Sequence, residues 1–308
     1  MNIPATLTQT MAPNITQRLA GRLTDYVQLC KPRIAVMVLV TVAAGYFMGA
    51  VGNFQWLPLL HVLLGTGLVA ASANIWNQLL ERTSDAQMRR TADRPLPAGR
   101  LSTNEVAMVG TISLVTGLNY LFYALPSVLP CLVAAATFLF YVAIYTPMKK
   151  FSTWNTVVGA IPGALPPVIG WTAARGNLDW AALCIFLVLF CWQLPHFMAI
   201  AWMYRDDYRR GGYRMLPVLD STGQRTSRAM IGWCVLLIAS SLLVLFFQPV
   251  DLLYLGISLV IGLWFLSSTL KFSHERTHSA AKQVLKVSII YLPIQMGIMM
   301  LNAARFPW

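Results

Sequence analysis

The chain alternates between long apolar runs and short polar connectors, and this pattern predicts its main elements. Nine runs of mostly uncharged residues are each close to the length of about 17 to 25 residues that a helix needs to cross a bilayer. The predicted spans cover residues 34–51, 56–76, 105–124, 128–146, 154–173, 179–203, 229–247, 251–270 and 284–303. Helices satisfy their own backbone hydrogen bonds in lipid, so we predict an all-α polytopic membrane protein.

The cationic residues gather in alternate connectors, which supports this number of spans. Assigning each connector to a side places 21 of the 23 lysines and arginines on the face of the N-terminus and leaves Arg175 and Arg305 for the other face. A count of eight or ten spans would destroy this segregation, because every later connector would change sides. The positive-inside bias therefore favours nine spans with a cytoplasmic, or matrix-facing, N-terminus.

Composition agrees with a membrane protein. Of the 308 residues, 57% are hydrophobic and 11% are charged, and the mean hydropathy is +0.60. An average soluble domain carries about 25% charged residues, so an ordinary soluble protein is excluded. The net charge of +12 reflects topology rather than binding to nucleic acid. Five cysteines lie in or beside apolar runs without a CxxC pair, which predicts buried, inert thiols.

The N-terminal residues differ from the rest of the chain. They contain basic residues and threonines but no apolar core of a secretory signal. We expect residues 1–25 to form a flexible cytoplasmic arm and residues 26–308 to form a single transmembrane domain. The compact length without a long presequence favours the bacterial cell inner membrane over the inner membrane of an organelle.

Two connectors on the cytoplasmic side are long and acidic. Residues 77–104 and 204–228 together contain six of the 11 acidic residues in the chain. Long loops on a rigid scaffold commonly carry reactive groups. We therefore expect the active site where these two connectors meet.

The first long connector opens with a regular set of oxygen-bearing side chains. Asn77, Glu81 and Asp85 recur every four residues in the sequence NQLLERTSD. If the helix continues, successive members lie about 6 Å apart along its axis and share one face. Magnesium prefers oxygen ligands and usually combines one or two carboxylates with substrate phosphates, so the triad predicts a Mg²⁺ site for a phosphorylated substrate. The alternative is a solvated helix end whose carboxylates balance nearby arginines.

The second long connector offers a matching set. His196 and Asp207 are eleven residues apart, close to three helical turns, so they share a face if the sixth span runs on through residue 207; Asp206 flanks them. Two acidic clusters on one face would hold two Mg²⁺ ions around a diphosphate, with basic side chains on its outer oxygens. The basic candidates are Arg94, Lys149 and Lys150. The alternatives are topology anchors for the two lysines and a hydrogen bond within the bundle for His196.

Longer motifs resemble a known family. The stretch Asn77-Gln78-x-x-Glu81-x-x-x-Asp85-x-x-Met88-x-Arg90-Thr91-x-x-Arg94-Pro95-Leu96-Pro97-x-Gly99 resembles the first aspartate-rich signature of the UbiA-type intramembrane prenyltransferases. Glu81 stands where many members have aspartate, and the Met-x-Arg-Thr-x-x-Arg-Pro portion resembles the haem-farnesylating branch. Three further segments agree in the expected order, namely Lys31-Pro32-Arg33, Tyr145-Thr146-Pro147-x-Lys149, and Trp192-Gln193-x-Pro195-His196-Phe197 leading to Asp207-Tyr208.

The resemblance implies a UbiA-type bundle of nine helices with a central cavity capped by the cytoplasmic loops. It implies Mg²⁺ as cofactor, and transfer of the farnesyl group of farnesyl diphosphate to the 2-vinyl group of haem B, with addition of water, to give haem O and diphosphate. Haem A synthase and terminal-oxidase assembly factors are the implied protein partners. The implied metal ligands are Asn77, Glu81, Asp85 and Asp207, with Asp206 beside the second ion; the diphosphate contacts are Arg90, Arg94, Lys149 and Lys150; the haem contacts are His196, Lys31 and Arg33.

Such a reaction needs no protein nucleophile. As the allylic carbon–oxygen bond ionises, cations stabilise the leaving diphosphate, and the vinyl carbon of haem attacks the farnesyl cation. Water then captures the positive charge beside the macrocycle, and His196 is our candidate for the base that accepts its proton. The same histidine is also a candidate contact for haem iron or a propionate, and Lys31 and Arg33 are equally well explained as anchors of the first span.

Three rival functions remain open at this point. One is a prenyltransferase of the same family that acts on another aromatic acceptor, and a second is a membrane transporter. Transporters of this size usually show internal repeats and place charged ligands near the bilayer midplane, whereas here the carboxylates lie at helix ends on one face. The third is a structural assembly subunit without chemistry.

Overall fold

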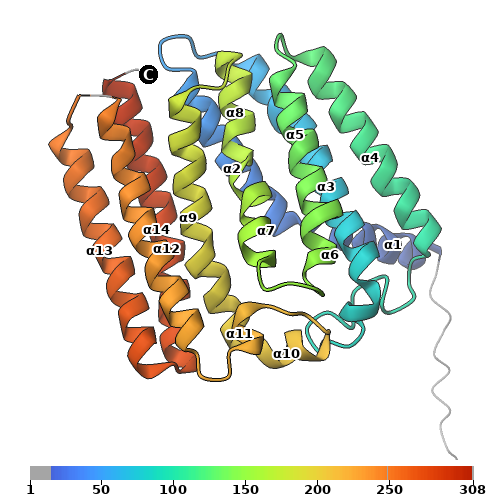
Figure 1. The fold of residues 1–308 in the computed structure, drawn as a ribbon. Helices are drawn as coiled ribbons and strands as arrows, with labels where there is room; N and C mark the ends of the chain where they lie inside the picture. The colour runs from blue at the N-terminus through green and yellow to red at the C-terminus, as the bar shows by residue number, and fades with distance from the viewer. Residues whose placement is uncertain (1–14, 248, 307–308) are drawn as a thin grey trace, which may run out of the picture.

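The computed structural model describes residues 15–247 and 249–306 and shows an all-helical bundle over them (Figure 1). Nine helical spans in these residues are long and apolar enough to cross a membrane, which confirms the predicted number. In chain order the helices are α1 (Ile15–Cys30), α2 (Pro32–Gly49), α3 (Trp56–Asp85), α4 (Thr103–Ala124), α5 (Leu129–Leu139), a π-helix (Phe140–Tyr145), α6 (Thr146–Met148), α7 (Asn155–Ala164), α8 (Pro166–Arg175), α9 (Trp180–Met203), α10 (Arg205–Arg210), α11 (Leu216–Leu219), α12 (Gln224–Leu242), a 3₁₀-helix (Leu243–Phe246), α13 (Leu252–Glu275) and α14 (His278–Arg305).

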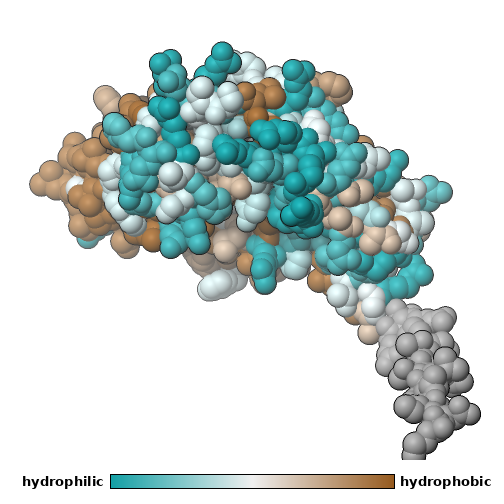
Figure 2. All heavy atoms as spheres, turned by 90° about the horizontal axis from the view of Figure 1, so that it is seen from below, coloured by the Kyte–Doolittle hydropathy of each residue, from teal (hydrophilic) through white to brown (hydrophobic). Residues whose placement is uncertain are grey.

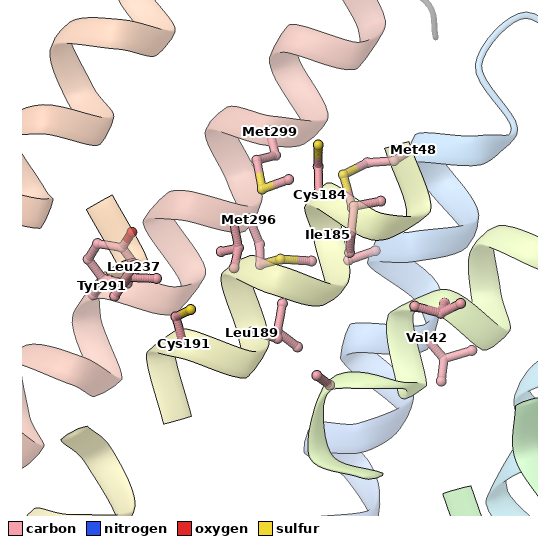
Figure 3. Close-up of a cluster of buried hydrophobic side chains, with 14 of the residues drawn as sticks. Val42, Met48, Cys184, Ile185, Leu189, Cys191, Leu237, Tyr291, Met296 and Met299 are labelled. Carbon is pink, nitrogen blue, oxygen red and sulfur yellow. The ribbon is translucent and has the colours of Figure 1, made fainter. Parts of the chain in front are cut away.

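The spans pack around α2, α9 and α14. Helix α2 packs on α3, α8 and α14, while α9 packs on α7, α12 and α14. Figure 3 shows part of the resulting core, where Val42, Ile185, Leu189 and Met296 lie among neighbouring helices. The helices keep large apolar side chains on their outer surface as well, as expected of a bundle that faces lipid instead of water.

Polar residues in the short connectors begin several spans. The side chains of Ser102, Asp179, Asp251 and Thr277 each accept a hydrogen bond from a backbone N–H in the first turn of the following helix. These caps satisfy donors that have no partner inside the helix. The sequence therefore marks these helix starts locally.

The fifth span is broken in the middle. Helix α7 ends at Ala164 and α8 begins at Pro166, so Leu165 separates them. The prolines in this stretch lack the N–H needed for a continuous helix, and they press against earlier carbonyls. The prolines of the fifth span therefore divide it into two helices.

Helix α3 is longer than the predicted second span, which ended at residue 76. It continues to Asp85 because its last turns pack against protein. Leu79 and Ile75 form a buried cluster with Leu29 of α1. The condition that placed Asn77, Glu81 and Asp85 on one helical face is therefore met.

Helix α9 is too short to place His196 and Asp207 on one helical face. It ends at Met203, and Tyr204 has φ −109° and ψ 22°, outside the helical region. A new helix, α10, begins at Arg205 and carries Asp206 and Asp207 in its first turn. The expectation of one unbroken helix through residue 207 is therefore wrong, because the backbone turns one residue after α9.

The N-terminal arm is described only in part. Residues 1–14 of the arm that we expect over residues 1–25 lie outside the described residues, and its remaining residues, from Ile15, belong to α1. In Figure 1, α1 runs crosswise to the spans. Asp25 and Tyr26 bind Arg100 and Glu105, and these contacts attach α1 to the segments on either side of the start of α4.

Close packing of α2 on α8 depends on two glycines and gives a testable prediction. A Cβ atom added to Gly170 would lie 1.9 Å from the carbonyl oxygen of Val42, and one added to Gly45 would lie 1.9 Å from that of Pro167. We expect Gly170→Ala to lower the free energy of unfolding in detergent by about 1–3 kcal/mol or more, because backbone must move to admit the methyl group. Gly232→Ala on α12 is the matched control, since a Cβ there meets no atom within 4 Å. Equal stability of both variants would contradict this packing.

Candidate active site

The polar centre of the protein is one face of α3 near its C-terminal end. Asn77, Glu81 and Asp85 are exposed by only 2%, 6% and 1%. We call the end of the bundle that carries these residues, α10 and α11 the loop face. Figure 2 shows hydrophilic side chains gathered across the middle of this face, with hydrophobic ones concentrated toward one end of the molecule.

Each of the three oxygen-bearing side chains meets its own cation. Lys31 Nζ donates to Asn77 Oδ1 at 2.9 Å, and Lys149 Nζ donates to Glu81 Oε1 at 2.7 Å. Arg94 Nη1 donates to Asp85 Oδ2 at 2.7 Å. Two buried carboxylates are thus paired as burial of charge requires, and a third basic group stands beside them.

The turn after the fourth span brings Lys149 to Glu81. The chain widens into a π-helix over Phe140–Tyr145, just before Pro147, which lacks a backbone donor. Thr146 then donates its hydroxyl to the carbonyl of Tyr141 at 2.8 Å and accepts from Asn77 Nδ2 at 3.1 Å. Lys149 Nζ lies 4.5 Å from the centroid of the Tyr145 ring, which adds a cation–π contact.

The surroundings shift the pKa values of the two lysines in opposite directions. Burial by itself lowers the pKa of Lys149, but the Glu81 carboxylate and nearby tyrosines outweigh it, so the pKa lies well above its usual value. Burial and the positive charge of Arg94 lower the pKa of Lys31 to about 7. Lys149 is therefore a fixed cation, while an anion beside Lys31 would favour its charged form.

The oxygen atoms of Asn77, Glu81 and Asp85 suit a hard cation only if a bound substrate supplies further oxygen ligands. Asp85 Oδ1 is buried and has no hydrogen-bond partner within the part of the chain that the structure describes. Among the same residues, no group of three or more His, Cys, Asp or Glu side chains is placed to hold a metal ion. Two carboxylates and an amide oxygen on one helix face are too few for a complete protein cage, but they fit Mg²⁺ shared with a phosphorylated substrate.

The first long connector closes this site from one side. Thr91 Oγ1 donates to the backbone carbonyl of Asp85 at 2.9 Å, which fixes the turn that returns Arg94 to the Asp85 carboxylate. Arg90 points elsewhere. Its guanidinium lies 5.0 Å from the centroid of the Tyr204 ring and donates to Tyr208 Oη at 3.4 Å, so it joins the two long connectors.

The second acidic cluster is not assembled like the first. Asp206 is exposed and binds Arg209 at 3.1 Å, and Asp207 is paired with Arg210 in the same short helix. His196 Nδ1 lies 2.8 Å from Ser288 Oγ, and its ring stacks on Trp192 with centroids 4.9 Å apart. The structure therefore places His196 against α14 and the two aspartates beside arginines of α10.

The remaining basic candidates differ in location. Lys31 lies beside Asn77, whereas Arg33 is exposed on α2. Lys150 follows Lys149 directly but is only partly buried. Of the cations selected from the sequence, the structure gathers Lys31, Arg94 and Lys149 at the α3 face.

Sequence reasoning missed several residues that shape the site. Tyr213 is buried, with its ring centroid 5.7 Å from Lys149 Nζ. The backbone N–H of Arg214 donates to the carbonyl of Lys149 at 2.7 Å, so the second long connector covers the lysine. The sequence signal for Tyr213 is weak, because an aromatic residue in a loop rarely indicates a buried neighbour 64 positions away in the chain.

An open groove lies elsewhere in the bundle. It has a volume of about 620 Å³ and lies between the second half of the fifth span and the start of α9, where Leu165, Val168, Trp180 and Phe186 line it. None of its lining residues belongs to the α3 face. The central cavity implied by the family resemblance stays a prediction.

Comparisons with known proteins agree on one family. The sequence profile of the UbiA prenyltransferase family matches residues 38–290. The chain is 42% identical over 287 residues to the protoheme IX farnesyltransferase of Solibacter usitatus, covering 90% of this chain and 98% of the relative.

Solved structures show the same fold at low sequence identity. The chain resembles a digeranylgeranylglyceryl phosphate synthase with a TM-score of 0.78 at 18% identity, covering 92% of this chain and 99% of the other. It resembles a UbiA homologue from Archaeoglobus fulgidus, bound to GPP and Mg²⁺, with a TM-score of 0.62 at 17% identity, covering 89% and 99%.

Asp220, the third acidic residue of the second long connector, has a structural position. Its carboxylate accepts hydrogen bonds from the backbone N–H groups of Gly223 and Thr226 and from the hydroxyls of Thr222 and Thr226. Burial by itself raises the pKa of Asp220, but these bonds outweigh it and hold the pKa below its usual value. Asp220 therefore caps the start of α12.

This cap predicts a pH-dependent stability. Because the folded-state pKa of Asp220 is below the unfolded one, its contribution is present at neutral pH and is lost as the pH falls toward the folded-state value. We expect Asp220→Asn to lower the free energy of unfolding by about 0.5–2 kcal/mol at pH 7, with the difference from wild type shrinking in acid. Denaturation in detergent at several pH values measures it. A difference that stays constant or grows in acid would refute the assignment.

Proposed function

The chain belongs to the UbiA prenyltransferase family, and from this premise we propose that it transfers a farnesyl group from farnesyl diphosphate to the 2-vinyl group of haem B. Water adds in the same reaction, and the products are haem O and diphosphate. The protein is a multi-pass membrane enzyme. We take haem as the acceptor because the relative from Solibacter usitatus is named protoheme IX farnesyltransferase.

The α3 face carries the proposal for the donor substrate. A buried row of two carboxylates and an amide, with three basic groups beside it, is unsuited to an apolar ligand alone. It suits a diphosphate whose charges would replace the internal ion pairs of Lys149 and Arg94. A farnesyl chain attached to that diphosphate would extend into the apolar interior of the bundle.

We propose Asn77, Glu81 and Asp85 as the residues that hold Mg²⁺ with the diphosphate. The orphaned Asp85 Oδ1 supports this choice, since a buried carboxylate oxygen without a donor is free to bind a cation. When bound, the ion would neutralise charge on the leaving diphosphate. A second ion at Asp206 and Asp207 would have to displace the neighbouring arginines with which both side chains are paired.

The cations of this chain then favour departure of the diphosphate. Lys149 and Arg94 hold positive charge beside the position where negative charge grows as the carbon–oxygen bond breaks. They are fixed by Tyr145, Tyr213 and the first long connector, so little rearrangement is needed at that moment. Lys150 and Arg90 are assigned lesser roles, since Arg90 joins the two connectors instead of facing Asp85.

The second half of the reaction needs an acceptor for one proton. The vinyl carbon of haem attacks the farnesyl cation, and water bonds to the resulting cation beside the macrocycle and loses a proton. We propose His196 as the group that takes this proton, because its Nδ1 is held by Ser288 and its ring is only partly buried. Lys31 and Arg33 are the basic candidates for a haem propionate, and Arg33 is exposed on α2.

We propose the bacterial inner membrane as the location, with the loop face in the cytoplasm. The strong excess of lysine and arginine in the connectors of that face supports this orientation. Haem A synthase and terminal-oxidase assembly factors stay predicted partners.

The reaction itself is the first prediction of this proposal. Purified protein in lipid, supplied with haem B, farnesyl diphosphate and Mg²⁺, should yield a haem heavier by one farnesyl and one hydroxyl group, detected by chromatography and mass spectrometry. Chelation of Mg²⁺ should abolish the product. Unchanged haem from folded protein, together with prenylation of a phenolic acceptor, would contradict the choice of haem.

The α3 ion pair provides the second prediction. We expect Lys149→Met to lower kcat for farnesyl transfer by about 10²–10³, the size typical for removal of one group that stabilises developing charge. Lys271→Met is the matched control, because Lys271 pairs with Glu275 on the outside of α13 and should leave kcat unchanged. Similar activities for the two variants would show that Lys149 serves only the fold.

A further inference from the structure

The junction of α1 and α2 is a sharp corner made by a single residue. Helix α1 ends at Cys30 and α2 begins at Pro32, so Lys31 alone connects them. Lys31 has φ 49° and ψ 64°, in the left-handed region that favours glycine. We call residues 29–32 the α1–α2 corner. A lysine keeps this backbone only where its surroundings hold it there.

Two buried amides of α3 hold the corner. Gln78 Nε2 donates to the carbonyl oxygen of Leu29 at 2.7 Å, and Asn74 Nδ2 donates to that of Cys30 at 3.0 Å. These carbonyls end α1, where a helix leaves its last acceptors without internal partners. Asn74 and Gln78 are exposed by 6% and 1% and lie four residues apart, on one face of α3.

The same face carries the contact of the lysine side chain. Asn77 lies between the two amides in sequence and accepts the hydrogen bond from Lys31 Nζ at 2.9 Å. The backbone of the corner and the ammonium of Lys31 are thus fixed to one helix. Arg100 further secures α1, since its Nε donates to Asp25 Oδ1 at 2.9 Å.

We propose that Asn74 and Gln78 are positioning residues that hold the α1–α2 corner, so that the Lys31 ammonium contacts the diphosphate of the prenyl substrate. This inference rests on the proposed function. It moves Lys31 from a haem propionate to the donor substrate, because the lysine lies against Asn77 in the row that continues to Glu81 and Asp85. Asn74 and Gln78 themselves bind the corner through its backbone carbonyl oxygens.

A double-mutant cycle on the full chain in lipid tests the proposal. Lys31→Met and Gln78→Met should each raise KM for farnesyl diphosphate about tenfold, the size typical of one lost charge-assisted hydrogen bond, with KM for haem unchanged. The double variant should be no worse than Lys31→Met alone, because both changes remove the same contact. Lys31→Arg should recover most of the affinity for farnesyl diphosphate.

A matched control separates positioning from general destabilisation. Gln295 is another buried glutamine and lies on α14, where its Nε2 donates to Tyr254 Oη at 3.1 Å. Gln295→Met should leave KM for farnesyl diphosphate unchanged, whatever it does to the unfolding temperature. Asn74→Leu repeats the cycle with the second amide, so a folding failure of Gln78→Met does not remove the test.

Additive effects of Lys31→Met and Gln78→Met on KM would overturn the proposal, as would a Gln78→Met protein that loses stability but keeps the wild-type KM. A rise in KM for haem alone would show that Lys31 contacts haem instead of the diphosphate. These results are distinct from failure of the proposed function, in which the wild-type protein itself would show no farnesyl transfer to haem.

Discussion

The structure depends on the burial of Glu81 and Asp85 at the end of a membrane helix. A buried carboxylate without a partner costs several kcal/mol, so each one must meet a cation. No neighbour on α3 provides these partners. Lys149 comes from the turn after the fourth span, and Arg94 comes from the connector that follows α3. Lys31 comes to the adjacent Asn77 from the α1–α2 corner. The tight turns around the site follow from the need to bring these cations to one helix face.

This arrangement also explains why irregular backbone gathers at the loop face. The π-helix before Pro147, the left-handed Lys31 and the turn at Thr91 each place one basic side chain. Their backbone groups are satisfied by side chains of α3 or by the turn itself. The spans beyond the site are held by apolar packing, with close approach at Gly45 and Gly170, and by hydrogen bonds between helices such as that of Gln295 with Tyr254. The paired carboxylates of the α3 face are therefore confined to one end of the bundle.

The two long connectors have unequal roles. The first connector supplies Arg94, which pairs with Asp85. The second connector covers Lys149 through Arg214 and Tyr213. Its acidic residues are engaged in local pairs or, for Asp220, in a helix cap. A symmetric pair of acidic clusters is the simplest interpretation of the sequence, but the break at Tyr204 turns α10 away from the axis of α9. The site is built mainly around α3.

The sequence by itself determined the number of spans, because a bilayer demands long apolar runs and places cations between them in a readable order. It also determined the shared face of Asn77, Glu81 and Asp85, since helical spacing is a local property. Only the tertiary structure decided which cation meets which oxygen, and that Tyr213 lies beside Lys149. Lys31 meets Asn77 from 46 positions away and Lys149 meets Glu81 from 68 positions away, and no local pattern encodes these contacts. Arg94 meets Asp85 from only nine positions away, through the turn that Thr91 fixes. The sequence also placed the end of the sixth span at residue 203, but only the structure decided that the chain turns at Tyr204 instead of continuing as one helix to Asp207.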